Sequence, residues 1–156
     1  MALVTPFFTD RAGKEWKLLI DINALRRVRD MLNVQIGDLR NLLENVTRLE
    51  YDDLFVADFA FACCQPEIAS RDITRDEFCK LIQGEKISQI HEIIKAGLQD
   101  FFRDKGRRAL VAETIKNVAS LHAAEEKSLI ESISSISATN SPGSSASSPA
   151  NTPSPA

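Results

Sequence analysis

The sequence predicts a mainly helical α+β domain: an N-terminal two-stranded antiparallel hairpin, a bundle of about five or six helices, and a disordered C-terminal tail. Three observations lead to this class. Between residues 6 and 36 the hydrophobic period changes from two residues to a helical one. Most later segments carry apolar residues at steps of three and four. From residue 137 the chain is rich in serine and proline and has no charged or aromatic side chain.

The hairpin is predicted from residues 7–22. Its turn, residues 10–14, is polar and contains Gly13, which can take a positive φ. The second strand is expected from about Glu15 to Ile22, because its apolar side chains alternate like those of a strand with one buried face. These side chains are Trp16, Leu18, Ile20 and Ile22.

A first helix follows, with Asn23 as its expected N-cap and its end near Asn33. Residues 38–45 predict a second helix. Residues 51–65 are mostly apolar and predict the central core helix, which Pro66 is expected to close because proline cannot continue the hydrogen-bond ladder.

The clearest local signal is a capping box at Thr74 and Glu77, which predicts a helix start. Gly84 stands where a left-handed residue would stop that helix. A longer helix is then expected over residues 86–103. Its apolar residues, Ile87, Ile90, Ile94, Leu98 and Phe101, recur at steps of three and four.

Three segments are predicted along the chain. Residues 1–106 form the hairpin and helical domain, residues 107–136 form a C-terminal amphipathic helix that packs back on the domain or stays free for a partner helix, and residues 137–156 form the disordered tail. A chain of 156 residues supports one compact domain. The oligomeric state does not follow from these residues.

Composition excludes several classes of function. The formal charge of -3 gives no general attraction to nucleic acid or anionic lipid. The longest apolar runs, such as residues 59–64, are far shorter than the roughly 20 residues that cross a bilayer, so no membrane span is expected. The first ten residues lack a basic group before their apolar stretch, which is unlike a secretory signal. The expected location is the cytoplasm.

No spacing of reactive residues indicates an enzyme, a metal site or a cofactor. Cys63, Cys64 and Cys79 lie in apolar helical patterns and are expected to be reduced, buried thiols. Asp58 lies among phenylalanines and is expected either to face solvent or to pair with an arginine. The two histidines, His91 and His122, have no partner at a recognised metal spacing and are expected to be surface or boundary residues.

Two helices around Gly84 allow a second interpretation, a nucleic-acid-binding regulator that uses the helix pair of residues 74–103. Phosphate contacts would come from one of two basic sets elsewhere, either Arg26, Arg27 and Arg29 or Lys105, Arg107 and Arg108. The longer helix begins with a nearly neutral set of side chains, whereas a recognition helix presents polar or basic groups there. An ordinary helical hairpin and a solvated arginine face are therefore favoured.

Residues 7–103 resemble the small tail-assembly chaperones of long-tailed bacteriophages and prophages. The resemblance is carried by FTDRAGKEWKLLIDINALRRVRDMLNV, LEYDDLFVADFAFACC, TRDEFCKLIQGEKI and GLQDFF. It implies a non-enzymatic helper without cofactor, made in the host bacterial cytoplasm. Such a helper binds the hydrophobic, helical tape-measure protein and keeps it soluble until the tail tube polymerises around it.

Candidate contacts for such a client are Phe101 and Phe102, because two adjacent helical residues cannot easily point into one core. Arg107 and Arg108 follow them and complete the candidate partner-binding set. The helix predicted over residues 107–136 offers a further apolar stripe for a client.

Overall fold

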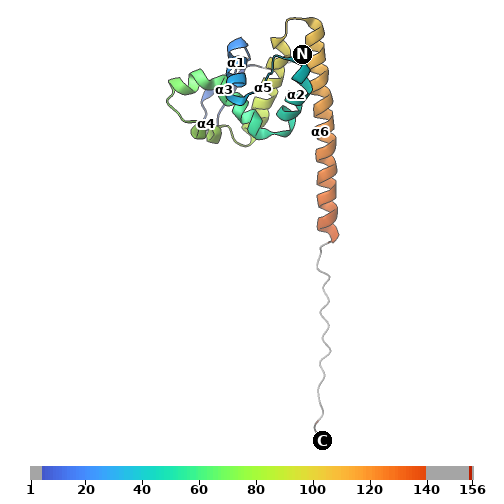
Figure 1. The fold of residues 1–156 in the computed structure, drawn as a ribbon. Helices are drawn as coiled ribbons and strands as arrows, with labels where there is room; N and C mark the ends of the chain where they lie inside the picture. The colour runs from blue at the N-terminus through green and yellow to red at the C-terminus, as the bar shows by residue number, and fades with distance from the viewer. Residues whose placement is uncertain (1–4, 140–154, 156) are drawn as a thin grey trace. The chain divides into compact units, whose positions relative to one another are not determined.

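The computed structural model describes residues 5–139 and 155 and confirms the predicted fold class (Figure 1). Within this part of the chain a two-stranded hairpin is followed by six α-helices and one 3-10 helix. The elements are β1 (Phe7–Thr9), β2 (Glu15–Lys17), α1 (Ile22–Leu32), the 3-10 helix η1 (Leu39–Asn41), α2 (Leu42–Tyr51), α3 (Asp53–Ser70), α4 (Arg75–Leu81), α5 (Glu85–Phe101) and α6 (Lys105–Thr139).

The hairpin is antiparallel, and Phe8 lies opposite Trp16. Gly13 has the expected positive φ, 81°. Asp10 is buried and organises the turn, because its carboxylate accepts hydrogen bonds from the Trp16 indole N–H at 2.7 Å, the Ala12 amide at 2.8 Å and the Lys14 amide at 3.0 Å. A buried carboxylate is stable only when its oxygens find such donors.

The second strand is shorter than predicted, because β1 has only three residues and offers no partner beyond Lys17. One more bond, from the Leu18 amide to the Pro6 carbonyl at 2.7 Å, continues the pairing. Trp16 and Leu18 are buried, as the alternation of apolar residues predicts. Ile20 is only partly buried and Ile22 is 61% exposed, because the chain has left the strand and Ile22 begins α1.

Helix α1 begins two residues earlier than predicted. Asp21, not Asn23, is the N-cap, and its carboxylate accepts a hydrogen bond from the Ala24 amide at 2.7 Å. The predicted end at Asn33 is confirmed, since this residue has φ 55° and takes the left-handed C-cap conformation that asparagine tolerates.

Helix α3 continues through Pro66 to Ser70, so the prediction that this proline closes the helix is wrong. A proline removes the N–H that would bond the carbonyl four residues earlier, here that of Ala62. The Arg27 guanidinium of α1 supplies the missing donor: Nε bonds the Ala62 carbonyl at 2.8 Å and a terminal nitrogen bonds the Cys63 carbonyl at 3.0 Å. The helix therefore tolerates the proline because a neighbouring side chain satisfies the freed carbonyl.

The capping box at the start of α4 is confirmed in both directions. Thr74 Oγ1 accepts a hydrogen bond from the Glu77 amide at 3.2 Å, and the Thr74 amide donates to the Glu77 carboxylate at 2.7 Å. Gly84 has φ 70°, but it precedes α5 as its N-cap, whereas Ile82 ends α4. The two helices are thus separated by a tight connection, as expected.

Helix α3 is the centre of the domain, and it contacts α1, α2, α4, α5 and β2. Most buried side chains belong to one cluster, in which Trp16, Phe59 and Phe78 are among the largest fully buried residues. A second, smaller cluster joins α2, the end of α5 and the start of α6. Its members are Leu42, Val46, Phe102, Val111, Ile115 and Val118.

Helix α6 spans the boundary between two units of the chain, Met1–His122 and Ala123–Ala156. Its first turns belong to the first unit, where Val111, Ile115 and Val118 are buried. Residues 137–139, predicted as the start of the tail, still belong to the helix; the rest of the predicted tail, apart from Pro155, lies outside the described residues. No helix of the described chain has the length and apolar character to span a bilayer.

Candidate partner-binding surfaces

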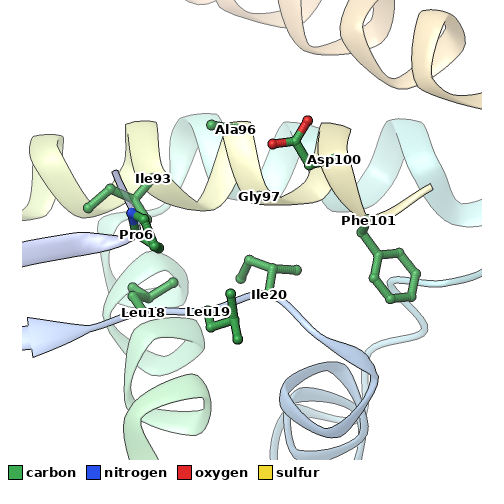
Figure 2. A pocket seen from close by; sticks show the side chains of 9 residues that line it. All are labelled: Pro6, Leu18, Leu19, Ile20, Ile93, Ala96, Gly97, Asp100 and Phe101. Atoms are coloured by element: carbon green, nitrogen blue, oxygen red, sulfur yellow. The ribbon is translucent and has the colours of Figure 1, made fainter. Parts of the chain in front are cut away.

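The first candidate surface is an apolar pocket between the hairpin and α5, which Figure 2 shows from close by. Its volume is about 200 Å³. The segment after β2 forms one wall, the second half of α5 forms the other, and the Asp100 carboxylate is the one charged group among the lining side chains. The lining residues are Pro6, Leu18, Leu19, Ile20, Ile93, Ala96, Gly97, Asp100 and Phe101.

Gly97 determines how closely the two walls approach. A Cβ atom at this position would overlap Ile20 Cγ1 and lie 3.0 Å from Ile20 Cβ. In Figure 2 the Ile20 side chain points at α5 directly below Gly97. The absence of a side chain at Gly97 therefore allows Ile20 to pack against the helix backbone.

Phe101 borders this pocket and also a second hollow on its other side, lined by Ile22, Leu25 and Ile36 among others. Its ring is partly buried and packs against both hydrophobic clusters. Of the two predicted client contacts, Phe101 therefore has an accessible face beside apolar hollows.

Phe102 is only 6% exposed and belongs to the second cluster. Its ring packs edge-on against that of Phe101, with centroids 5.3 Å apart. Phe101 packs partly against the same cluster. Phe102 is core of the domain and offers no surface to a client.

Arg107 and Arg108 have different environments. Arg107 lines an open polar hollow together with Asp38 and Arg40. The Arg108 guanidinium donates to the carbonyl of Phe102 and, at 3.5 Å, to that of Asp100, both at the end of α5. Arg108 therefore caps α5 at its C-terminus, where the last carbonyls lack intrahelical donors.

The arginines of α1 do not form a uniformly solvated face, because Arg27 bonds the α3 carbonyls. Arg29 pairs with Asp30 at 2.9 Å on the surface, and Arg26 is exposed. The predicted basic cluster is thus divided between a structural role and a local ion pair.

The groups considered as candidate reactive residues have the following environments, and Cys79, which was expected to be buried, is only partly so. Asp58 pairs with Arg75 at the start of α4, one of its two predicted environments. Cys63 and Cys64 are buried free thiols. Burial raises the pKa of both, that of Cys64 to about 12, so neither carries appreciable thiolate at neutral pH.

A polar cluster that sequence spacing did not reveal lies around Glu50 of α2, whose side chain is only 10% exposed. Glu50 Oε2 lies 3.1 Å from His91 Nε2 and 3.9 Å from Lys95 Nζ, and Oε1 lies 3.6 Å from His122 Nδ1. Both histidines therefore share one carboxylate, contributed by a helix 41 residues or more away in sequence. We call these four residues the Glu50 cluster.

The His91 and Glu50 atoms face each other without the alignment of a hydrogen bond. Burial and then the Lys95 ammonium lower the pKa of His91, whereas the Glu50 and Glu92 carboxylates act in the opposite direction. The pKa of His91 is therefore held below its ordinary value, and the Lys95 ammonium lies within ion-pair distance of Glu50.

The last candidate surface is the part of α6 beyond His122. Every side chain of residues 123–139 is exposed, including four large apolar ones. Leu129, Ile130, Ile133 and Ile136 are 58–64% exposed. Isolated exposed leucines are ordinary, but four within eight residues of one helix form a patch.

No protein-family model, curated protein or solved structure matches this chain. Within residues 5–139 and 155, no three histidine, cysteine, aspartate or glutamate side chains are grouped as a metal site requires.

Proposed function

We propose that this protein is a non-enzymatic tail-assembly chaperone that binds a tape-measure protein and keeps it soluble in the host bacterial cytoplasm. Two independent considerations support the proposal. Residues 7–103 resemble such chaperones in sequence. The chain also presents apolar helix surface to solvent, which a helper of hydrophobic helices needs.

The observation that carries the proposal is the exposed apolar patch at the end of α6, formed by Leu129, Ile130, Ile133 and Ile136. A tape-measure protein is a long, hydrophobic, helical chain, and an amphipathic helix pairs with another through side chains at steps of three and four. Leu129, Ile133 and Ile136 have this spacing. Pairing would remove apolar surface of both helices from water.

The pocket beside Phe101 provides a second contact in this proposal. It is apolar, partly open, and built on the rigid helix α5. A side chain from the client that enters it would cover Phe101, the member of the predicted aromatic pair that remains accessible.

The test is co-expression of the full chain with the tape-measure protein encoded by the same phage or prophage, followed by measurement of the soluble client fraction and of co-purification. The client should be soluble with the chaperone and aggregate without it. The double variant Leu129→Ser/Ile133→Ser should lose most of this effect.

A matched control is Leu43→Ser/Leu54→Ser, which also replaces two exposed apolar residues, 65% and 78% exposed, but on α2 and α3. This variant should keep the client soluble. A tape-measure protein whose solubility does not depend on the chain, or a genome without such a gene near this one, would contradict the proposal.

A further inference from the structure

The distal part of α6 combines apolar and acidic residues on one face. Glu125 and Glu126 precede Leu129, Ile133 and Ile136 at steps of three and four residues, so the five side chains share one side of the helix. We call these five residues the distal face. Glu131 and Lys127 lie on the opposite side at this helical spacing.

The second half of this helical segment has few features that stabilise a helix by itself, apart from the i,i+4 pair of Lys127 and Glu131. Residues 123–139 contain five serines and three isoleucines, which have modest helix propensity. The Ser132, Ser134, Ser135 and Ser137 hydroxyls all bond the carbonyl four residues earlier, which slightly weakens a helix. Helices in proteins derive most of their stability from packing an apolar face, and here the apolar face is exposed. A partner that covers this apolar face would therefore stabilise the helix over residues 123–139.

The occupant cannot come from the rest of this chain's C-terminal sequence. Residues 140–156 contain no leucine, isoleucine, valine, aromatic or basic residue. They have neither the apolar side chains to cover Leu129 and Ile133 nor a positive charge for the two glutamates.

A second copy of the chain also fits poorly. In a parallel pair of copies, Glu125 and Glu126 would face the same carboxylates of the other copy, and like charges repel. In an antiparallel pair centred on the apolar residues, they would lie opposite Thr139 and the uncharged sequence that follows it, so they would gain no ion pair. A partner helix that has an apolar stripe, and lysine or arginine opposite Glu125 and Glu126, offers a matching contact to every side chain of the distal face.

We infer that the distal face docks an amphipathic helix of another protein, with a leucine, isoleucine or valine stripe along Leu129, Ile133 and Ile136 and with lysine or arginine opposite Glu125 and Glu126. This inference rests on the proposed function and narrows it. It states which helical segments of a tape-measure protein the chaperone selects.

The test uses the full chain and two labelled synthetic helical peptides, measured by fluorescence anisotropy. Both peptides carry the same leucine stripe; one has lysines and the other has glutamates at the positions that meet Glu125 and Glu126. The lysine peptide should bind about fivefold or more tightly at low salt, as expected for two exposed ion pairs. This preference should shrink at high salt.

Charge reversal makes the test specific. Glu125→Lys/Glu126→Lys should invert the preference between the peptides. The control Glu131→Lys changes charge on the opposite side of the helix and should preserve it. Leu129→Ser/Ile133→Ser should abolish binding of both peptides.

Three results would overturn the inference: equal affinity for both peptides, no binding of either, or sedimentation showing a dimer of the chain that Leu129→Ser/Ile133→Ser disperses. These results are distinct from failure of the proposed function. If the co-expressed client stays soluble but the Glu125→Lys/Glu126→Lys variant is fully active, the chaperone function stands and the charge selection is wrong. If the client is never solubilised, the function itself fails.

Discussion

At the scale of single residues, Gly97 and the Glu50 cluster have roles that depend on neighbours distant in sequence. Gly97 permits Ile20 to lie against α5, and Glu50 gathers His91, Lys95 and His122 from two other helices. Each role gives a measurable effect on stability.

Gly97→Ala should lower the free energy of unfolding by about 1–2 kcal/mol. Overpacking against Ile20 costs about 1–3 kcal/mol, and the better helix propensity of alanine returns up to about 1 kcal/mol. Urea denaturation of the variant measures the change. Gly106→Ala is the control, because a Cβ there meets only the Asp104 carboxylate, at 3.0 Å. In an Ile20→Ala background, which removes the overlapping Cγ1 but keeps Cβ, the Gly97→Ala penalty should shrink; an undiminished penalty would contradict the packing explanation.

The lowered pKa of His91 predicts a loss of stability on mild acidification. The unfolded chain protonates His91 near the ordinary pKa of 6.5, whereas the folded protein does so only at lower pH. The unfolded state therefore binds this proton at a higher pH than the folded state does. The free energy of unfolding keeps the full contribution of neutral His91 above pH 6.5, and this contribution is lost as the pH falls from 6.5 through the pKa of His91 in the folded protein. The groups facing His91 are Glu50, Asp53, Glu92 and Lys95.

The measurement is the free energy of unfolding between pH 7.5 and 5.5 for the wild type and for His91→Gln. The wild type should lose stability across this range, and the variant should show a flatter profile. The carboxylates whose pKa is lowered, such as those of Asp10 and Glu77, stay ionised throughout this window and do not contribute. A wild-type protein that becomes more stable at pH 5.5 would show that the attraction of Glu50 outweighs burial.

At the scale of elements, the continuation of α3 through Pro66 depends on α1. The Arg27 guanidinium replaces the hydrogen bond that proline cannot make. Arg27→Met keeps much of the aliphatic stem and removes the donor, so it should cost about 1–3 kcal/mol of stability by leaving the Ala62 carbonyl unsatisfied.

A double-mutant cycle tests the connection between the two residues. In a Pro66→Ala background the residue 66 amide can bond the Ala62 carbonyl, so Arg27→Met should then cost less. Strict additivity of the two substitutions would mean that Arg27 does not compensate for the proline. Arg26→Met, which changes an exposed arginine of the same helix, is the control.

The elements also show what the sequence could predict. The capping box at Thr74, the positive φ of Gly13 and the end of α1 at Asn33 are local patterns, and all three are confirmed. The end of α3 was mispredicted, because the residue that satisfies the Ala62 carbonyl is 35 positions away. The length of β2 was overestimated, because a strand extends only as far as its partner.

The candidate site was predictable to a similar extent. Helical spacing identified an apolar stripe after residue 107, and adjacent phenylalanines identified a place where one ring must leave the core. Spacing could not tell that Phe102 would be the buried ring, because this depends on the second cluster formed by α2 and α6. The Glu50 cluster likewise joins three helices and leaves no local pattern.

At the scale of the whole molecule, the residues of α6 are divided between the two units of the chain, Met1–His122 and Ala123–Ala156. The buried residues of α6 end at Val118, and the exposed apolar patch begins at Leu129. The proposed chaperone activity uses two apolar surfaces, the pocket beside Phe101 and the exposed patch of α6.

The measurement that tests this account most directly is hydrogen–deuterium exchange of the full chain, alone and in complex with the co-expressed tape-measure protein. Free residues 123–139 should exchange rapidly, because their helix has no packed face. In the complex, the amides around Leu129, Ile133 and Ile136 should become strongly protected. A complex that forms while these amides exchange as fast as in the free chain would contradict the account, because the client would then bind elsewhere.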